Sequence, residues 1–113
     1  MNYRILLHKE FRKEFKRLYK KYKSLKCYFE ALSDDLASNP FIGADLGNGV
    51  RKIRMAITSK GKGKSHGARV ITYASAIVSV DEEGVVVILS IYDKAERDTI
   101  SSADIAALLD SFE

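Results

Sequence analysis

The spacing of hydrophobic residues changes along this chain of 113 residues, and the change constrains the fold more than any other feature. Between His8 and Asn39 the apolar residues recur every three or four positions, which is the spacing of amphipathic helices. From Val50 to Tyr92 apolar and polar residues alternate or form short β-branched runs, as they do in strands. The resulting mixture of helical and strand segments predicts the α+β class.

Turn and capping signals divide the chain further. Ser24 is expected to cap a second helix, and Asn39-Pro40 to end it. The segment 43–49, with its Asn-Gly signal, is expected to be a loop. Ser101, followed by Asp104, is expected to cap the last helix. The expected elements are a strand at 3–7, a helix from His8, a second helix after a tight turn at Lys23, strands at 50–57, 68–80 and 85–92, and a helix from Ser101.

This order, β-α-α-β-β-β-α, predicts a single domain over residues 1–113, in which a helix hairpin covers an antiparallel three-strand meander. Within the strand at 50–57, alternation turns Ile53, Met55 and Ile57 toward the core. Lys52 and Arg54 then face the other side.

Several classes of protein are disfavoured by composition. Cys27 is the single cysteine, so the chain cannot form an intramolecular disulfide, and we expect no structural zinc site. We find no signal-peptide pattern and no apolar run near the roughly 20 residues that a membrane-spanning helix needs. We therefore expect a reduced, cytoplasmic protein with no membrane partner, no metal and no cofactor.

Charge is segregated along the sequence. Residues 1–26 carry ten Lys/Arg against two Glu, and residues 51–72 carry seven Lys/Arg and no acid. Residues 73–113 carry two bases against nine acids. Two separate basic blocks indicate a positive side that suits a polyanion or an acidic protein partner.

The second basic block holds the candidate functional residues. Its central string, Lys60-Gly-Lys62-Gly-Lys64, lies between two expected strands, where glycines permit close approach and lysines supply charge to phosphates. The alternative is a hairpin loop whose lysines only aid solubility. A nucleotide-binding phosphate loop is rejected, because Thr58 stands where that motif needs glycine and no helix is expected to follow.

Side chains near this block could perform chemistry on a phosphate. Arg69 could hold a phosphate oxygen pair and stabilise extra charge, beside Lys52 and Arg54. His66 has the ordinary titration range for proton transfer, although a lone loop histidine is more often only a loop residue. Tyr92 and Lys94 end the last expected strand and could lie nearby.

Several strings resemble the RelE/HigB group of bacterial type II toxins over nearly the whole chain. They are KKYKSL, NPFIGADLGNG, RKIRMAI, SKGKGKS, GARVITY and SIYDKAERD, with 50–73 the most specific part. The resemblance implies a small basic microbial-ribonuclease-type fold, cleavage of mRNA on the ribosome, and neutralisation by an antitoxin encoded beside it, a small helix-turn-helix protein. A related ParE-like branch inhibits DNA gyrase instead.

The resemblance also implies roles for individual residues. Arg69 matches the arginine that contacts the scissile phosphate, and Lys52 and Arg54 match the basic pair on the family's second strand. Tyr92 and Lys94 fall near the positions that offer an aromatic and a cationic group. The expected catalytic residues are Arg69, Lys52, Arg54, Lys94, Tyr92 and His66, and the expected RNA-binding residues are Arg51, Lys60, Lys62 and Lys64.

Two departures from that pattern leave the general base open. Arg54 stands where RelE has lysine, and an arginine stays protonated. The loop 58–67 is longer than RelE's and contains His66. A protein that inhibits gyrase, or one that binds RNA without cutting it, remains the alternative.

Overall fold

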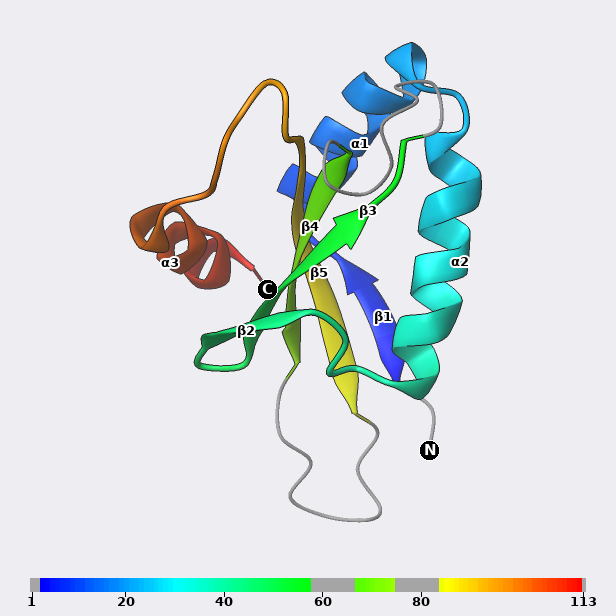
Figure 1. The fold of residues 1–113 in the computed structure, drawn as a ribbon. Coiled ribbons are helices and arrows are strands. Elements are labelled where there is room, and N and C mark those ends of the chain that lie inside the picture. Colours follow the sequence, from blue (N-terminus) through cyan, green and yellow to red (C-terminus); the bar gives the residue numbers. More distant parts are fainter. Residues whose placement is uncertain (1–2, 58–66, 75–83, 113) are drawn as a thin grey trace.

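The computed structural model describes residues 3–57, 67–74 and 84–112. These residues form a five-stranded mixed sheet with helices on both faces (Figure 1). The elements are β1 (Arg4–Leu7), α1 (Lys9–Lys21), α2 (Leu25–Ser38), β2 (Ala44–Gly47), β3 (Val50–Met55), β4 (Ala68–Ala74), β5 (Val85–Asp93) and α3 (Ser102–Ser111). The strand order is β1-β5-β4-β3-β2. The α+β class is therefore confirmed.

The predicted antiparallel meander is formed by β3, β4 and β5, but the sheet extends beyond it at both edges. β1 pairs in parallel with β5, and β2 pairs antiparallel with β3. The prediction of a loop at 43–49 was thus wrong for Ala44–Gly47. Asn48 and Gly49 have φ angles of 55° and 84°, which suit a two-residue hairpin turn that returns the chain onto β3.

Boundaries differ in detail from those expected. β3 ends at Met55 instead of at 57, and β5 extends to Asp93. The expected loop at 58–66 and the end of the strand expected at 68–80, from 75 onward, lie outside the described residues.

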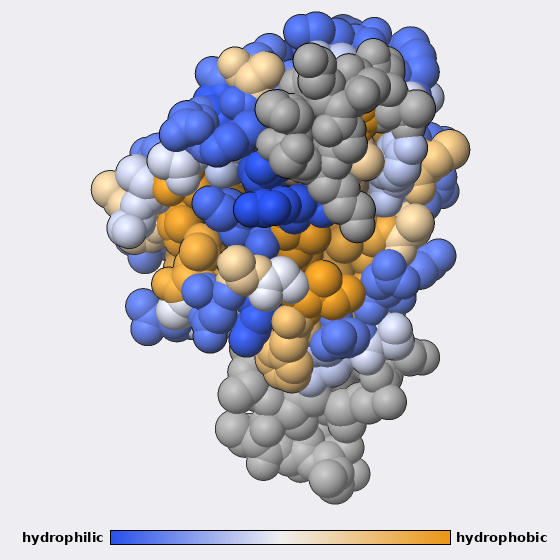
Figure 2. Space-filling view, viewed as in Figure 1, coloured by the Kyte–Doolittle hydropathy of each residue, from blue (hydrophilic) through white to orange (hydrophobic). Residues whose placement is uncertain are grey.

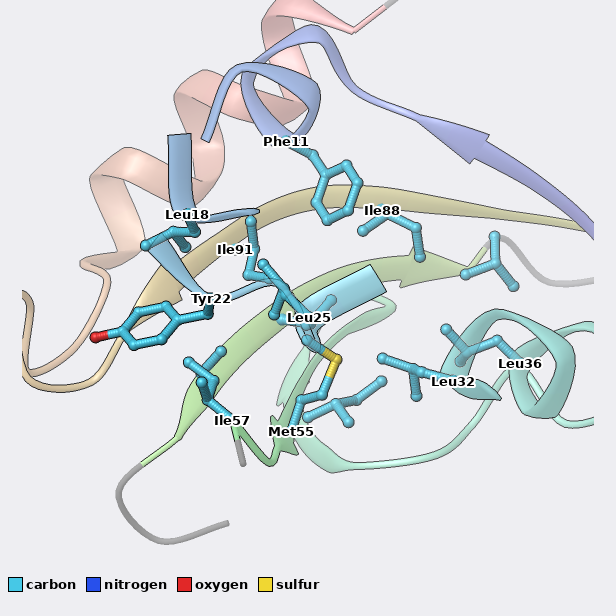
Figure 3. Packing of buried hydrophobic residues seen from close by; sticks show 14 of the residues in the cluster. Phe11, Leu18, Tyr22, Leu25, Leu32, Leu36, Met55, Ile57, Ile88 and Ile91 are labelled. Atoms are coloured by element: carbon cyan, nitrogen blue, oxygen red, sulfur yellow. The ribbon is translucent and has the colours of Figure 1, made fainter. Parts of the chain in front are cut away.

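One face of the sheet is covered by α1 and α2, whose aromatic and aliphatic stripes pack against it (Figure 3). Phe29 of α2 packs on both Phe11 and Phe15 of α1, with ring centroids 4.9 and 5.4 Å apart. The predicted inward direction of Ile53, Met55 and Ile57 is confirmed, since all three are buried in this cluster. Burial of each large apolar side chain contributes about 1.5–3 kcal/mol.

Among the described helices, α3 covers the opposite face. Val50, Ile71, Val87, Leu89, Tyr92 and Ile100 form its buried cluster. α3 contributes only partly buried side chains to it, Ile105, Leu108, Leu109 and Phe112. This face is therefore less completely covered than the first, which leaves room for polar residues on it. No helix in the described part of the chain is both long and apolar enough to cross a membrane.

Only one of the two serine caps predicted from the sequence is present in the structure. Ser101 accepts a hydrogen bond from the backbone N–H of Asp104 at 3.1 Å, so the predicted cap of α3 is confirmed. Ser24 does precede α2, but its φ and ψ are helical and its hydroxyl makes no capping bond. The predicted Ser24 cap is therefore wrong, because a helical backbone at this position turns the side chain away from the free N–H groups.

His8 caps α1 and joins it to α3. Its Nδ1 accepts a hydrogen bond from the Glu10 N–H at 2.9 Å, so the proton of the neutral ring is on Nε2. Nε2 lies 3.0 Å from the Leu108 carbonyl oxygen and 3.0 Å from Ser111 Oγ. The ring is buried, and one side chain thereby connects the start of α1 to the end of α3.

We expect His8→Ala to lower the free energy of unfolding by about 2–3 kcal/mol, since it removes a helix cap and a buried hydrogen bond. Ser24→Ala is the matched control and should change stability by less than about 0.5 kcal/mol, because no capping bond is lost. Urea unfolding of the two variants measures both values. Equal destabilisation would contradict the assignment of the caps.

Candidate functional site

Two arginines and a tyrosine form a row across three neighbouring strands on the α3 face of the sheet. In the antiparallel register Arg54 of β3 lies opposite Arg69 of β4, and Arg69 lies opposite Tyr92 of β5. Side chains that are directly opposite in this way have Cβ atoms about 4.5–5.5 Å apart. The sheet therefore holds the three side chains together without help from a loop.

This row brings one buried and one exposed positive charge together. Arg69 is only 5% exposed, and its Nη1 donates to the Ala68 carbonyl oxygen at 3.2 Å. Arg54, on the neighbouring strand, is exposed to solvent. Like charges directly opposite each other on neighbouring strands are unfavourable, and burying a guanidinium adds a desolvation cost. An anion bound between the two arginines would interact favourably with both positive charges.

Tyr92 contributes a hydroxyl group to which none of the described residues is hydrogen-bonded. The residue is 4% exposed, and its hydroxyl has no hydrogen-bond partner among the described residues. The Arg97 guanidinium lies over its ring, 5.6 Å from the centroid. Buried hydroxyls are nearly always hydrogen-bonded, and one that is not is often found where a ligand or water binds.

Two lysines flank the row. Lys52 lies two residues before Arg54, and Lys94 follows the end of β5. The Lys94 N–H donates to the Gly67 carbonyl oxygen at 3.1 Å. A Cβ at Gly67 would lie 2.2 Å from the Met55 carbonyl oxygen, so only glycine permits this approach of the strand ends. Figure 2 shows a band of hydrophilic residues across the middle of the molecule, beside hydrophobic ones.

A buried carboxylate orders the turn that carries Lys94. Asp93 is fully buried and accepts hydrogen bonds from the Tyr22 hydroxyl at 3.1 Å and from the Ala95 N–H at 3.0 Å. Its carbonyl oxygen accepts from the N–H groups of Glu96 and Arg97. Tyr22 belongs to the end of α1 and directs its hydroxyl away from the aliphatic cluster (Figure 3). The first helix is thus connected to the site.

The same turn is attached to α1 by an ion pair at the surface. Arg17 donates to both carboxylate oxygens of Glu96, at 2.8 and 3.2 Å, and to Glu14 at 3.0 Å. The hydrogen bond from Arg17 lowers the pKa of Glu96 below its ordinary value. Exposed pairs of this kind contribute little to stability, but two hydrogen bonds fix the orientation of the turn.

Beside the row lies a groove of about 300 Å³ between α3 and the β2–β3 hairpin. Lys52 lines it together with Val50, Ile100, Ile105 and Leu109. The groove is therefore lined by apolar side chains together with one cation, Lys52. No group of three or more His, Cys, Asp or Glu residues that could hold a metal ion occurs among the described residues.

The predicted site residues separate into three groups. Lys52, Arg54, Arg69, Tyr92 and Lys94 come from β3, β4 and the end of β5 and lie at one side of the sheet. Three lysines and a histidine lie outside the described residues, so their predicted roles cannot be compared with the structure: Lys60, Lys62, Lys64 and His66.

Arg51 lies apart from the row. It alternates with Lys52 and so faces the α2 side of the sheet, where its guanidinium lies 4.8 Å from the Phe41 ring centroid and 3.9 Å from an Asp45 carboxylate oxygen. The structure therefore does not bring Arg51 to the other basic residues of β3.

Sequence reasoning missed four residues around the site: Tyr22, Asp93, Arg97 and Asp98. Asp93 carries a weak signal, since an acid directly after a β-branched strand often begins a turn. The role of Tyr22 had no signal, because its apolar ring fits the helical stripe and its hydroxyl partner is distant in sequence.

The sequence matches no protein-family model and no curated protein in comparisons with known proteins. Inferences about function therefore depend on the residues of the site and their arrangement.

The same substitution, tyrosine to phenylalanine, should have different effects on stability at Tyr22 and Tyr92. Tyr22→Phe removes a hydrogen bond to a buried carboxylate and should lower the free energy of unfolding by about 1.5–3 kcal/mol. Tyr92→Phe removes a buried hydroxyl without a partner and should leave stability unchanged or raise it slightly. Thermal or urea unfolding measures both. A loss of stability in Tyr92→Phe as large as that in Tyr22→Phe would show that the hydroxyl is structural.

Proposed function

We propose that this protein is a metal-independent endoribonuclease of the RelE/HigB kind, the toxin of a type II toxin–antitoxin module that cuts ribosome-bound mRNA. The observation that carries the proposal is the row of Arg54, Arg69 and Tyr92, in which a buried guanidinium lies beside a buried hydroxyl that has no hydrogen-bond partner among the described residues. These groups suit one ligand, a phosphate in a chain. The resemblance of 50–73 to the family's most specific segment supports RNA as that chain.

The chemistry needs charge stabilisation first. When the RNA 2′-oxygen attacks the adjacent phosphorus, the O2′–P bond forms, the P–O5′ bond breaks, and negative charge gathers on the phosphoryl oxygens. Arg54 and Arg69 lie opposite each other on neighbouring strands, which supports a role for their two guanidinium groups in binding those oxygens. Donors fixed in place before the reaction stabilise such charge most effectively, because they need not reorient.

Two proton transfers complete the step. The 2′-hydroxyl proton passes to Lys52 or His66, which are the candidate bases. The leaving 5′-oxygen receives a proton from Tyr92 or Lys94. Tyr92 is adjacent to Arg69 in the register, so its hydroxyl is suited to act close to the same phosphate. The products are a 2′,3′-cyclic phosphate and a free 5′-hydroxyl.

Expression of Arg69→Ala in bacteria should abolish the growth arrest caused by the wild-type chain. Loss of one fixed donor to developing charge should slow mRNA cleavage about 100- to 1,000-fold. Because Arg69 is buried, Arg54→Gln is tested in parallel: it is exposed, cannot disturb the core, and should also lose activity. Arg51→Gln, on the opposite face, is the control and should retain it.

The same cultures distinguish the competing functions. Mapping RNA ends after induction should reveal cuts in translated mRNA that are absent with Arg69→Ala. Trapped gyrase–DNA breaks with intact mRNA would contradict the proposal and indicate a gyrase inhibitor. Salt-sensitive RNA binding without cleavage, even on translating ribosomes, would indicate a binding module.

Tyr92→Phe should reduce the rate of RNA cleavage by about 10- to 100-fold while the variant remains as stable as the wild type. The reason is that its hydroxyl has no hydrogen-bond partner among the described residues, so its loss would remove a group proposed to act on the ligand and no internal hydrogen bond. Single-turnover cleavage together with thermal unfolding checks the combination. Unchanged cleavage would remove Tyr92 from the mechanism and leave Lys94 as the proton donor.

A further inference from the structure

The exposed face of α1 carries only positive charge. Seven residues of this helix are exposed, and all of them are lysine or arginine: Lys9, Arg12, Lys13, Lys16, Arg17, Lys20 and Lys21. Its two acids, Glu10 and Glu14, are partly buried, and Glu14 is paired with Arg17. None of these cations belongs to the proposed ribonuclease site, which lies on the α3 side of the sheet.

Four of the lysines form a stripe along the helix. They are Lys9, Lys13, Lys16 and Lys20. Because they are three or four residues apart, they lie on one side of α1 and follow one another about 4.5–6 Å apart along its axis. Like charges at this spacing destabilise a helix, and α1 is held instead by the burial of Phe11 and Leu18. The stability of α1 therefore does not explain the stripe.

Other cations at the surface have acidic partners. These ion pairs join Arg17 to Glu96, Lys94 to Asp98 and Arg97 to Asp104. The four lysines of the stripe make no ion pair with any residue in the described ranges. Their charge is therefore left to interact with another molecule.

The composition of this face favours a polyanion over a protein or a membrane. Protein interfaces have an apolar or aromatic centre and are poor in lysine, and none of the exposed residues of α1 is apolar. A basic helix that binds a bilayer inserts its apolar side, but that side of α1 is packed against the sheet. A stripe of lysines with no other chemistry suits a series of phosphates.

Among nucleic acids, the face suits a base-paired backbone better than a single strand. Proteins bind single strands partly by stacking the bases on aromatic side chains, and none of the exposed residues of α1 is aromatic. Base-paired RNA is recognised mostly through its shape, its phosphates and its 2′-hydroxyl groups. Lysines on the surface of a straight helix can contact such phosphates without reading a base.

One end of α1 reaches the turn that borders the ribonuclease site. Arg17 donates to Glu96 at 2.8 Å, and Tyr22 donates to Asp93 at 3.1 Å. Both acceptors belong to the segment that carries Lys94. An RNA bound along α1 would therefore extend toward the strand ends at which the row of Arg54, Arg69 and Tyr92 lies.

We propose that the lysine stripe of α1 is a docking surface for the backbone of base-paired RNA, separate from the site that cuts the single strand. The choice of RNA over DNA rests on the proposed function. The stripe holds the protein on a folded RNA while the α3 face acts on an unpaired strand beside it. Docking does not depend on base sequence, because phosphate contacts carry no sequence information.

Replacing three lysines of the stripe with glutamine tests the docking surface: Lys13→Gln, Lys16→Gln and Lys20→Gln. An RNA duplex of mixed sequence should bind this triple variant about 10- to 100-fold more weakly than the wild type at about 0.1 M salt. The slope of log affinity against log salt should become shallower by about 2–3, because each lost phosphate contact releases fewer counterions. Thermal unfolding should show that the variant is at least as stable as the wild type, since repulsion within α1 falls. Unchanged affinity and slope would overturn the docking surface.

Two other triple variants are the controls. Arginine at the same three positions keeps the charge and should bind the duplex like the wild type. The second control lowers the net charge equally, at exposed positions of α3: Ser102→Glu, Ala103→Glu and Ala106→Glu. It should lose less than about threefold in affinity, because salt screens charges that do not touch the ligand. A loss equal to that of the glutamine variant would show that only net charge matters and would overturn the stripe.

The outcomes separate this inference from the proposed function. Duplex binding that depends on the stripe, together with mRNA cuts that persist in Arg69→Ala, would retain the docking surface and remove the ribonuclease site. Cuts that require Arg69, with duplex binding unchanged in the glutamine variant, would do the reverse. Stripe-dependent binding that is tighter to a DNA duplex, to an unpaired RNA strand or to polyglutamate would overturn base-paired RNA as the partner.

Discussion

Backbone pairing among β3, β4 and β5 determines where the charged groups of the site lie. Each strand by itself only assigns its side chains to one face or the other. Pairing places Arg54 opposite Arg69 and Arg69 opposite Tyr92, so three groups that are far apart in sequence become neighbours. If one strand shifted by one residue in this pairing, its side chains would move to the opposite face of the sheet. The hydrophobic clusters on both faces oppose such a shift.

The two faces of the sheet have different roles. The face under α1 and α2 holds the larger apolar cluster, in which packing supplies most of the stability (Figure 3). The α3 face holds a smaller cluster, together with the buried Arg69 and the Tyr92 hydroxyl, which has no described hydrogen-bond partner. Buried hydroxyls without a described partner also occur at Ser24 and Thr72, so this feature is not confined to one face.

Connections between the faces pass around the ends of the strands. Tyr22 at the end of α1 donates to Asp93, and Asp93 orders the turn that carries Lys94 and Arg97. His8, at the start of α1, contacts the end of α3. The positions of the cations at the site therefore depend on a helix that lies on the far side of the sheet. Proper formation of the site requires both layers to be folded.

The sequence by itself determined the α+β class, the helices, the three strands of the meander and the outward direction of Lys52 and Arg54. These are local properties, because periodicity and turn chemistry act over a few residues. The addition of β1 and β2 to the sheet, the row from Arg54 to Tyr92, and the contacts of Asp93 and Asp98 were decided only by the tertiary structure. Register and strand order depend on how well residues distant in sequence bury one another's apolar side chains. A local sequence pattern cannot predict these contacts. Phosphate chemistry could thus be anticipated from the basic segment 50–73, whereas the geometry that would perform it could not.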